Sequence, residues 1–189
     1  SGNQYANGRL TANITVNTNV LTATGDLNGD PASFRAWTPI DEFRGSFHGD
    51  GYVISGLYAK AYGVGFISYG INVKVYNLGV MDSYFENTGY ASGAIVGYMS
   101  SNGTMENCFS NATIAGSSYI SGGLVGEANH YAAVRNCYYF GKTVGGAFAY
   151  SGFSWYDSKS GNNYYVSTVD DGCKFTTAIS PDILATGEL

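Results

Sequence analysis

Three oxygen-bearing side chains, Asp26, Asn28 and Asp30, occupy alternate positions in one short polar segment. Alternate side-chain oxygens of this kind bind calcium in the first half of an EF-hand loop. Such a loop also needs Gly at its sixth position and Glu at its twelfth, where this chain has Pro31 and Trp37. The segment is therefore predicted to form a turn rich in Asp and Asn. Calcium binding at the three oxygen-bearing residues is the alternative, and no other cofactor is predicted.

Three aromatic residues, Phe153, Trp155 and Tyr156, stand close together late in the chain. They fall between Ala149 and Asn163, an interval longer than the matching intervals of the repeats described below. Inserted loops often carry binding sites, and flat aromatic rings offer an apolar face to a sugar ring. The three residues are therefore the candidates for carbohydrate binding, and packing of Trp155 against the body of the protein is the alternative.

The acidic residues and the two histidines do not form a recognisable catalytic group. Inverting glycoside hydrolysis needs two carboxyl groups roughly 6.5–9.5 Å apart. The adjacent acids at 41–42 and at 170–171 would point to opposite faces of a strand. His48 and His130 have no Ser, Cys or Asp partner at a recognisable spacing. We therefore predict no catalytic residues, and a polysaccharide lyase or hydrolase is the least favoured function.

These candidates belong to a chain that repeats. Gly-rich apolar segments are each followed by an asparagine, and the asparagines are Asn77, Asn107, Asn136 and Asn163. Successive members lie 30, 29 and 27 residues apart. A period this regular predicts stacked units, each of which buries its apolar residues against the next.

The repeating unit has the pattern of a coil of short β-strands. Its apolar residues come in short runs separated by Gly, Asn and Ser, without the spacing of an amphipathic helix. Three short strands joined by tight corners fit a period of about 29 residues. The predicted fold is all-β: a right-handed parallel β-helix, or β-solenoid, of about five to six coils.

The whole chain, residues 1–189, is predicted to be a single domain. Residues 9–61 would form the N-terminal coils and residues 62–166 the repeats. Residues 167–189 differ in composition and are predicted to cap the C-terminal end, where strand edges would otherwise stay unpaired. Ser180 followed by Pro181 is typical of a helix N-terminus, so a short helix is expected there.

Stacking places equivalent residues of successive repeats next to one another. Cys108 and Cys137 each follow a repeat asparagine, which predicts two neighbouring, buried and reduced thiols. A disulfide is the alternative, although parallel Cβ vectors disfavour its torsion. Tyr76, Glu106 and Arg135 each precede a repeat asparagine, which predicts an exposed row with an attraction between Glu106 and Arg135.

Charge and hydropathy argue against two classes of partner. The net charge is −5 and the nine Lys and Arg residues are scattered, whereas phosphate binding needs them clustered. The chain has no run of about 18 apolar residues that could span a membrane. We therefore expect neither nucleic-acid binding nor membrane insertion by this chain.

The repeats resemble a known family. Gly-Gly-Leu-Val-Gly at 122–126 is followed ten residues later by Asn-Cys-Tyr at 136–138. This pattern resembles the GLUG motif of large bacterial surface proteins, among them adhesin-like proteins of gut bacteria and the non-catalytic regions of some IgA-specific peptidases. Segments 37–57 and 179–189 are similar to those that flank such repeats. Ser68 and Ala149 depart from the motif, since they stand where it has its last Gly.

The resemblance implies a module of a larger secreted or surface-anchored bacterial protein that acts outside the cell. Its implied task is non-catalytic adhesion or display. The implied partners are a host or neighbouring surface protein or glycan, together with the other domains of the parent chain. The alternative function is a carbohydrate-binding module that uses the loop aromatic residues Phe153, Trp155 and Tyr156.

Overall fold

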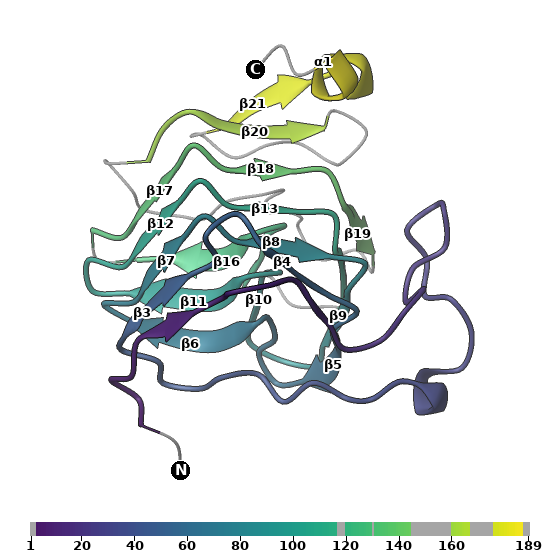
Figure 1. The fold of residues 1–189 in the computed structure, drawn as a ribbon, viewed down its shortest axis with the longest axis horizontal. Helices are drawn as coiled ribbons and strands as arrows, with labels where there is room; N and C mark the ends of the chain where they lie inside the picture. Colours follow the sequence, from purple (N-terminus) through teal and green to yellow (C-terminus); the bar gives the residue numbers. More distant parts are fainter. Residues whose placement is uncertain (1–2, 117–119, 130, 145–159, 167–175, 187–189) are drawn as a thin grey trace.

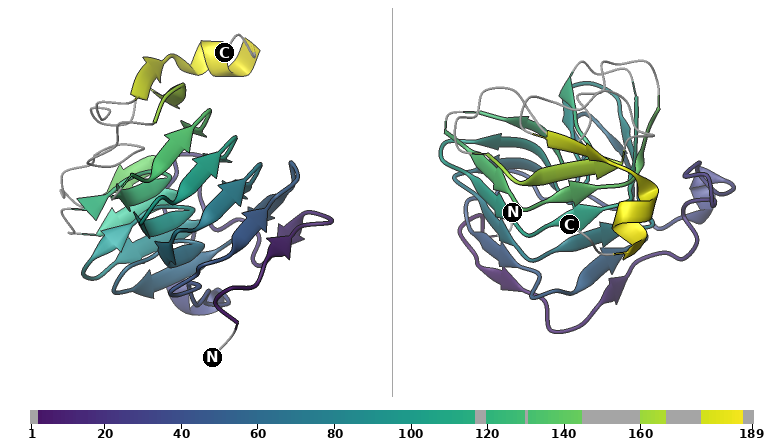
Figure 2. Two further views of the ribbon diagram at one scale, coloured as in Figure 1. Left: turned by 90° about the vertical axis from the view of Figure 1, so that its left-hand side faces the viewer. Right: turned by 90° about the horizontal axis from the view of Figure 1, so that it is seen from above.

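The computed structural model describes residues 3–116, 120–129, 131–144, 160–166 and 176–186. In this part of the chain, short parallel strands of successive turns lie one above another and form a β-solenoid (Figure 1). Two further views show the strands stacked in chain order from the N-terminal to the C-terminal end (Figure 2). The predicted all-β solenoid is confirmed.

Three successive turns are complete in the part of the chain that the structure describes. The first contains Ser46–His48 (β3), Val53–Ser55 (β4), Tyr58–Ala61 (β5) and Ile67–Ile71 (β6). The second contains Lys74–Tyr76 (β7), Gly79–Met81 (β8), Tyr84–Asn87 (β9), Ala91–Ser92 (β10) and Val96–Ser100 (β11). The third contains Thr104–Glu106 (β12), Phe109–Ser110 (β13), Thr113–Gly116 (β14), Ile120–Ser121 (β15) and Val125–Ala128 (β16). The prediction of three strands per coil was wrong, because additional corners divide each turn into shorter strands.

Partial turns lie at both ends of the stack. The N-terminal part contains Gly8–Arg9 (β1), Ile14–Thr15 (β2) and a 3-10 helix, Pro31–Ser33 (η1). The C-terminal part contains Ala133–Arg135 (β17), Tyr138–Tyr139 (β18), Lys142–Val144 (β19), Asn163–Val166 (β20), Thr176–Ile179 (β21) and the helix Pro181–Thr186 (α1). The expected coil number, about five to six, was somewhat too high. One reason is that residues 20–33 form a loop on the outside of the stack, on the right of Figure 1, and not a further turn.

Each step across a sheet corresponds to one turn of the chain. The longest sheet has the order β2-β4-β8-β13-β18-β20-β21, and the one beside it the order β1-β3-β7-β12-β17. Three further sheets, β5-β9-β14-β19, β6-β11-β16 and β10-β15, complete the circumference. The register follows the repeat: Val75 pairs with Met105, and Met105 pairs with Val134. All three side chains are buried in the centre of the solenoid, so the core is continuous from turn to turn.

A row of asparagines marks the corner between β7 and β8 and the equivalent corners above it. Asn77, Asn107, Asn136 and Asn162 all have a positive φ of 53° to 55°. Asparagine is one of the few residues that adopt this left-handed conformation readily. The side-chain amides of Asn107, Asn136 and Asn162 each donate to the asparagine of the previous turn, at Nδ2–Oδ1 distances of 2.9, 3.3 and 3.3 Å.

The fourth member of this row is Asn162 and not Asn163, so that prediction was wrong by one residue. Tyr138 pairs with Tyr164, and this register places Asn163 above Cys137. Asn163 is buried, and its Oδ1 accepts from the backbone N–H of Cys137 at 3.1 Å. In the turn below, the Sγ of Cys137 accepts from the N–H of Cys108 at 3.4 Å. Asn163 therefore continues the cysteine row, and the prediction of two buried, unbridged thiols is confirmed.

The expected C-terminal helix is present as α1. Its first residue is Pro181, and the hydroxyl of Ser180 accepts from the N–H of Ile183 at 3.4 Å. This is the contact of an N-cap residue, and Pro is favoured directly after it. The helix follows β21, the last strand of the longest sheet, at the C-terminal end of the stack (Figure 2).

Candidate functional site

The residues that the sequence singled out for binding do not come together in the described part of the chain. Phe153, Trp155 and Tyr156 lie outside the described residues, so carbohydrate binding by these side chains stays a prediction. His130 also lies outside them. His48 lies beside Tyr76 in the neighbouring strand, with ring centroids 5.1 Å apart.

The three oxygen-bearing residues of the proposed calcium turn have different partners. The Oδ1 of Asp26 accepts from the Nζ of Lys142 at 2.5 Å. The side-chain amide of Asn28 donates to a backbone carbonyl. The Oδ1 of Asp30 caps η1 by accepting from the N–H of Ala32 at 2.9 Å. The hydrogen bond from Lys142 lowers the pKa of Asp26, with a further contribution from the Thr24 hydroxyl. No group of three or more His, Cys, Asp or Glu side chains suited to a metal ion gathers within the ranges that the structure covers. Calcium binding at this turn stays a prediction.

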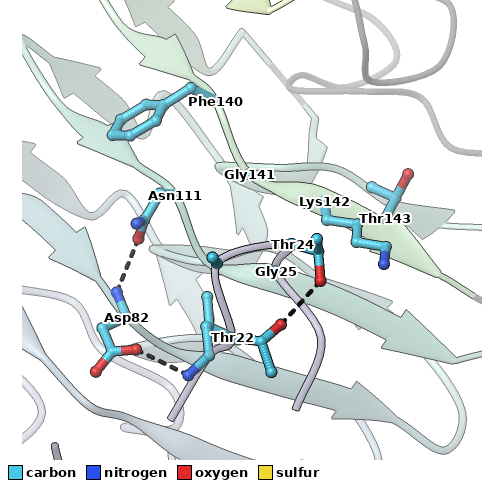
Figure 3. A pocket seen from close by; sticks show the side chains of 11 residues that line it. Thr22, Thr24, Gly25, Asp82, Asn111, Phe140, Gly141, Lys142 and Thr143 are labelled. Carbon is cyan, nitrogen blue, oxygen red and sulfur yellow. Dashed lines mark hydrogen bonds between the residues drawn. The ribbon is translucent and has the colours of Figure 1, made fainter. Parts of the chain in front are cut away.

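The loop that precedes Asp26 lies against the flank of the solenoid, where Thr22, Thr24 and Gly25 line a hollow of about 800 Å³ (Figure 3). The carboxylate of Asp82 accepts from the backbone N–H groups of Val20 and Leu21 at 3.1 and 2.8 Å. The hydroxyl of Thr113 donates to the carbonyl of Gly25 at 2.5 Å. These contacts join residues 61 to 88 positions apart, so the polar groups of this loop attach it to the stack.

A different flank carries four tyrosines that the structure brings together: Tyr62, Tyr69, Tyr90 and Tyr98. We call them the tyrosine cluster. Ring centroids lie 6.3 Å apart between Tyr62 and Tyr90, 5.6 Å between Tyr90 and Tyr98, and 5.2 Å between Tyr69 and Tyr98. The side chains of Tyr62 and Tyr90 are 74% and 41% exposed. Contiguous exposed aromatic surface of this kind is typical of an interaction site.

The stacking of turns positions these rings. Tyr69 in β6 pairs directly with Tyr98 in β11, so the two rings lie one strand spacing apart. Tyr62 lies over the backbone of the next turn, where a Cβ on Gly89 would stand only 1.9 Å from its ring carbon Cδ2. Because Gly89 has no side chain, the ring of Tyr62 can lie close to that backbone. Rings that are placed by strands keep a fixed geometry before any ligand binds.

The cluster lines a groove of about 570 Å³ that also has Asp41 in its wall. The Oδ1 of Asp41 accepts from the hydroxyl of Ser68 at 2.9 Å. At the other end of the cluster, Glu127 pairs with Tyr98 in the neighbouring strand, and the amide of Asn129 donates to both the Glu127 carboxylate and the Tyr98 hydroxyl. The groove therefore combines aromatic faces with carboxylate and hydroxyl groups, and the amide of Asn129 lies beside it, at Tyr98.

Burial raises the pKa of Tyr90 to about 12, with a smaller contribution from the negative charge of Glu127. Burial also raises the pKa of Tyr98 above its usual value. Both phenols are therefore neutral near pH 7, where each can donate and accept hydrogen bonds. The site offers stacking and hydrogen bonding to a ligand without a charge on the rings.

Sequence reasoning missed the tyrosine cluster, although a signal was present. Tyr62 and Tyr90 lie 28 residues apart, and Tyr69 and Tyr98 lie 29 apart, both close to the period of the asparagines. Tyrosines at the repeat period predict a stacked row on one flank. The predicted pairing and attraction in the row next to the asparagines are confirmed, since the guanidinium of Arg135 lies 3.2 Å from the Glu106 carboxylate. The row is partly buried, however, and not exposed as predicted.

The fold and this surface together define a repeat-built β-solenoid with an exposed aromatic groove. Protein-family models, curated proteins and solved structures were all compared with the chain, and none of them matches it. None of the helices within the described ranges has the length and apolar character that a membrane crossing requires.

Proposed function

We propose that this chain is a non-catalytic binding module of a larger bacterial surface or secreted protein, and that the tyrosine cluster binds glycans outside the cell. The observation that carries the proposal is the set of adjacent tyrosine rings along a groove on one flank, with Tyr62 largely exposed and Tyr90 partly exposed. The resemblance of the repeats to the GLUG motif supports the adhesion or display role and the extracellular location.

The chemistry of the groove suits a saccharide. The C–H faces of a pyranose ring are apolar and stack on aromatic rings, while its hydroxyls need partners of both hydrogen-bonding types. Tyr62 and Tyr90 offer the ring faces. Asp41, Asn129 and the phenol of Tyr98 offer acceptors and donors nearby. Binding sites in general combine aromatic walls with a few placed polar groups.

The solenoid favours binding because it holds the rings in place. Tyr69 and Tyr98 are part of the parallel ladder between β6 and β11. A ligand that meets a preformed surface orders few side chains, so less of the interaction free energy is lost on binding. Two successive turns each contribute two of the rings, so the aromatic surface extends along the axis, which suits a ligand that is itself a chain of similar units.

A glycan array tests the proposal. The wild-type module is compared with the double variant Tyr62→Ala/Tyr90→Ala and with the control Tyr5→Ala/Tyr52→Ala, which removes two exposed tyrosines outside the groove. Each lost ring contact should cost about 0.5–1.5 kcal/mol, so the cluster variant should bind at least about fivefold more weakly. Equal binding by the two variants, or no binding by the wild type, would contradict the proposal.

Two further arms of the same array separate the alternatives. A Trp155→Ala/Tyr156→Ala variant tests the loop aromatic residues, and loss of binding there with an intact cluster would move the site to that loop. Repeating the array with calcium and with EDTA tests the turn at Asp26, Asn28 and Asp30. Loss of binding in EDTA alone would assign the metal role to that turn.

A further inference from the structure

The charged side chains around the tyrosine cluster are acidic. Asp41 is the one charged residue among the described residues that line the groove. Glu127 lies beyond the other end, one strand spacing from Tyr98, and its negative charge contributes to the raised pKa of Tyr90. The aromatic faces are thus bounded by a carboxylate at each end.

The two carboxylates are separated by the height of the cluster. The bridge between Ile40 and Ile67 places Asp41 one rung before Ser68. Ser68 belongs to β6, which is itself one rung before the strand of Tyr98. Glu127 belongs to the turn after Tyr98. Three rungs of about 4.8 Å therefore lie between the strand of Asp41 and that of Glu127, a height of roughly 14 Å. A ligand long enough to cover both exposed rings would meet the field of both acids.

Several of the described basic side chains form ion pairs away from the groove, and Arg44 lies over the ring of Tyr5. Lys60 forms an ion pair with Glu86, Arg135 with Glu106 and Lys142 with Asp26. A cation over the face of a tyrosine is attracted by the negative face of the ring, and a nearby carboxylate adds to this attraction. An anion would be repelled by the same groups.

We infer that the tyrosine cluster selects glycans that carry protonated amines, such as glucosamine-type units, over neutral glycans, and that it rejects uronic-acid glycans. The inference rests on the proposed glycan binding and adds the class of ligand. One exposed cation–aromatic contact together with one solvent-exposed charge pair should tighten binding about tenfold.

The test uses three oligosaccharides of equal length: fully deacetylated glucosamine, its N-acetylated counterpart, and galacturonic acid. Calorimetric titration at low salt and about pH 6 keeps carboxylates ionised. We expect the amine-bearing ligand to bind about tenfold more tightly than the N-acetylated one, and the uronic acid not to bind. Raising the salt concentration should reduce the difference, because salt screens exposed charges.

Two double variants make the test specific, since a protein of net charge −5 attracts any cation to some extent. Asp41→Asn/Glu127→Gln should bring the affinities for the amine-bearing and N-acetylated ligands close together, so the quantity compared is the ratio of the two affinities in each variant. Asp50→Asn/Asp182→Asn removes the same charge at two exposed positions away from the groove and should keep the preference. Thermal unfolding checks that each variant is folded.

The outcomes separate this inference from the proposal beneath it. If the N-acetylated ligand binds through Tyr62 and Tyr90 but the amine brings no gain, the charge selection is refuted and glycan binding stands. If the gain survives in Asp41→Asn/Glu127→Gln, it arises from the overall charge, and the inference is again refuted. If none of the saccharides binds, both the inference and the proposed function fall.

Discussion

Replacing Asn107 tests why an asparagine recurs at each corner of this solenoid. Asn107 has a φ of 55°, and its side chain takes part in two hydrogen bonds of the asparagine row. Asn107→Ala loses both the hydrogen bonds and the tolerance for a left-handed backbone. Asn107→Gly loses the hydrogen bonds but keeps that tolerance. The pair of variants therefore separates the two contributions.

The magnitudes follow from the position of the residue. Asn107 is exposed, so each of its two hydrogen bonds should contribute about 0.5 kcal/mol, the low end of the usual range. The left-handed conformation costs an alanine about 1 kcal/mol or more. We therefore expect Asn107→Ala to lower the free energy of unfolding by about 2 kcal/mol and Asn107→Gly by about 1 kcal/mol.

Urea unfolding, followed by far-ultraviolet circular dichroism, measures the difference. The two variants should shift the midpoint at an unchanged slope, with the alanine variant shifted about twice as far. Ser101, also exposed and at a positive φ of 55° but outside the asparagine row, supplies a control: Ser101→Gly should be neutral or stabilising. Equal midpoints for the alanine and glycine variants would refute the backbone argument, and a wild-type midpoint for both would refute the role of the row.

Three more outcomes are expected. Gly89→Ala should displace the ring of Tyr62 and weaken glycan binding about two- to tenfold. In a Tyr62→Ala background the same substitution should have no further effect on binding, which a double-mutant cycle measures. Additive losses of affinity would contradict this. Cys108 and Cys137 are buried, and burial raises the pKa of the Cys137 thiol. Peptide mass spectrometry after treatment with an alkylating reagent should therefore find both thiols unmodified in the native protein and alkylated in urea. Rapid alkylation of the native protein would contradict this. The pKa of Tyr90 is raised to about 12 in the folded state, so the stability that this residue contributes below about pH 10 should decline as pH rises toward 12. Unfolding curves of the wild type and of Tyr90→Phe between about pH 10 and 12 measure this decline.

The period of the repeat was enough to predict the solenoid and its vertical neighbours. Parallel turns of equal length place a residue above the one a period earlier, so Cys108 and Cys137 had to meet. The same argument paired Glu106 with Arg135 correctly. It was wrong at the fourth asparagine because two asparagines, Asn162 and Asn163, adjoin there, and only the pairing of β18 with β20 distinguishes them.

The period does not determine which residues meet across a corner within one turn. Tyr90 and Tyr98 are eight residues apart in the sequence, yet their rings lie 5.6 Å apart because the chain turns between β10 and β11. Likewise, the contact between Lys142 and Asp26 joins residues 116 positions apart, and Asp26 lies in the N-terminal loop, ahead of the repeats. Neither contact has a signal in spacing.

By itself, therefore, the sequence determined the class of fold, the stacked rows and the buried thiols, because these depend only on a regular period and on alternately apolar segments. The tertiary structure decided the size of a turn, the attachment of the N-terminal loop and the assembly of the tyrosine cluster. These depend on the backbone angles at each corner, such as the left-handed asparagines and the close approach at Gly89, which set the direction in which each side chain leaves the stack.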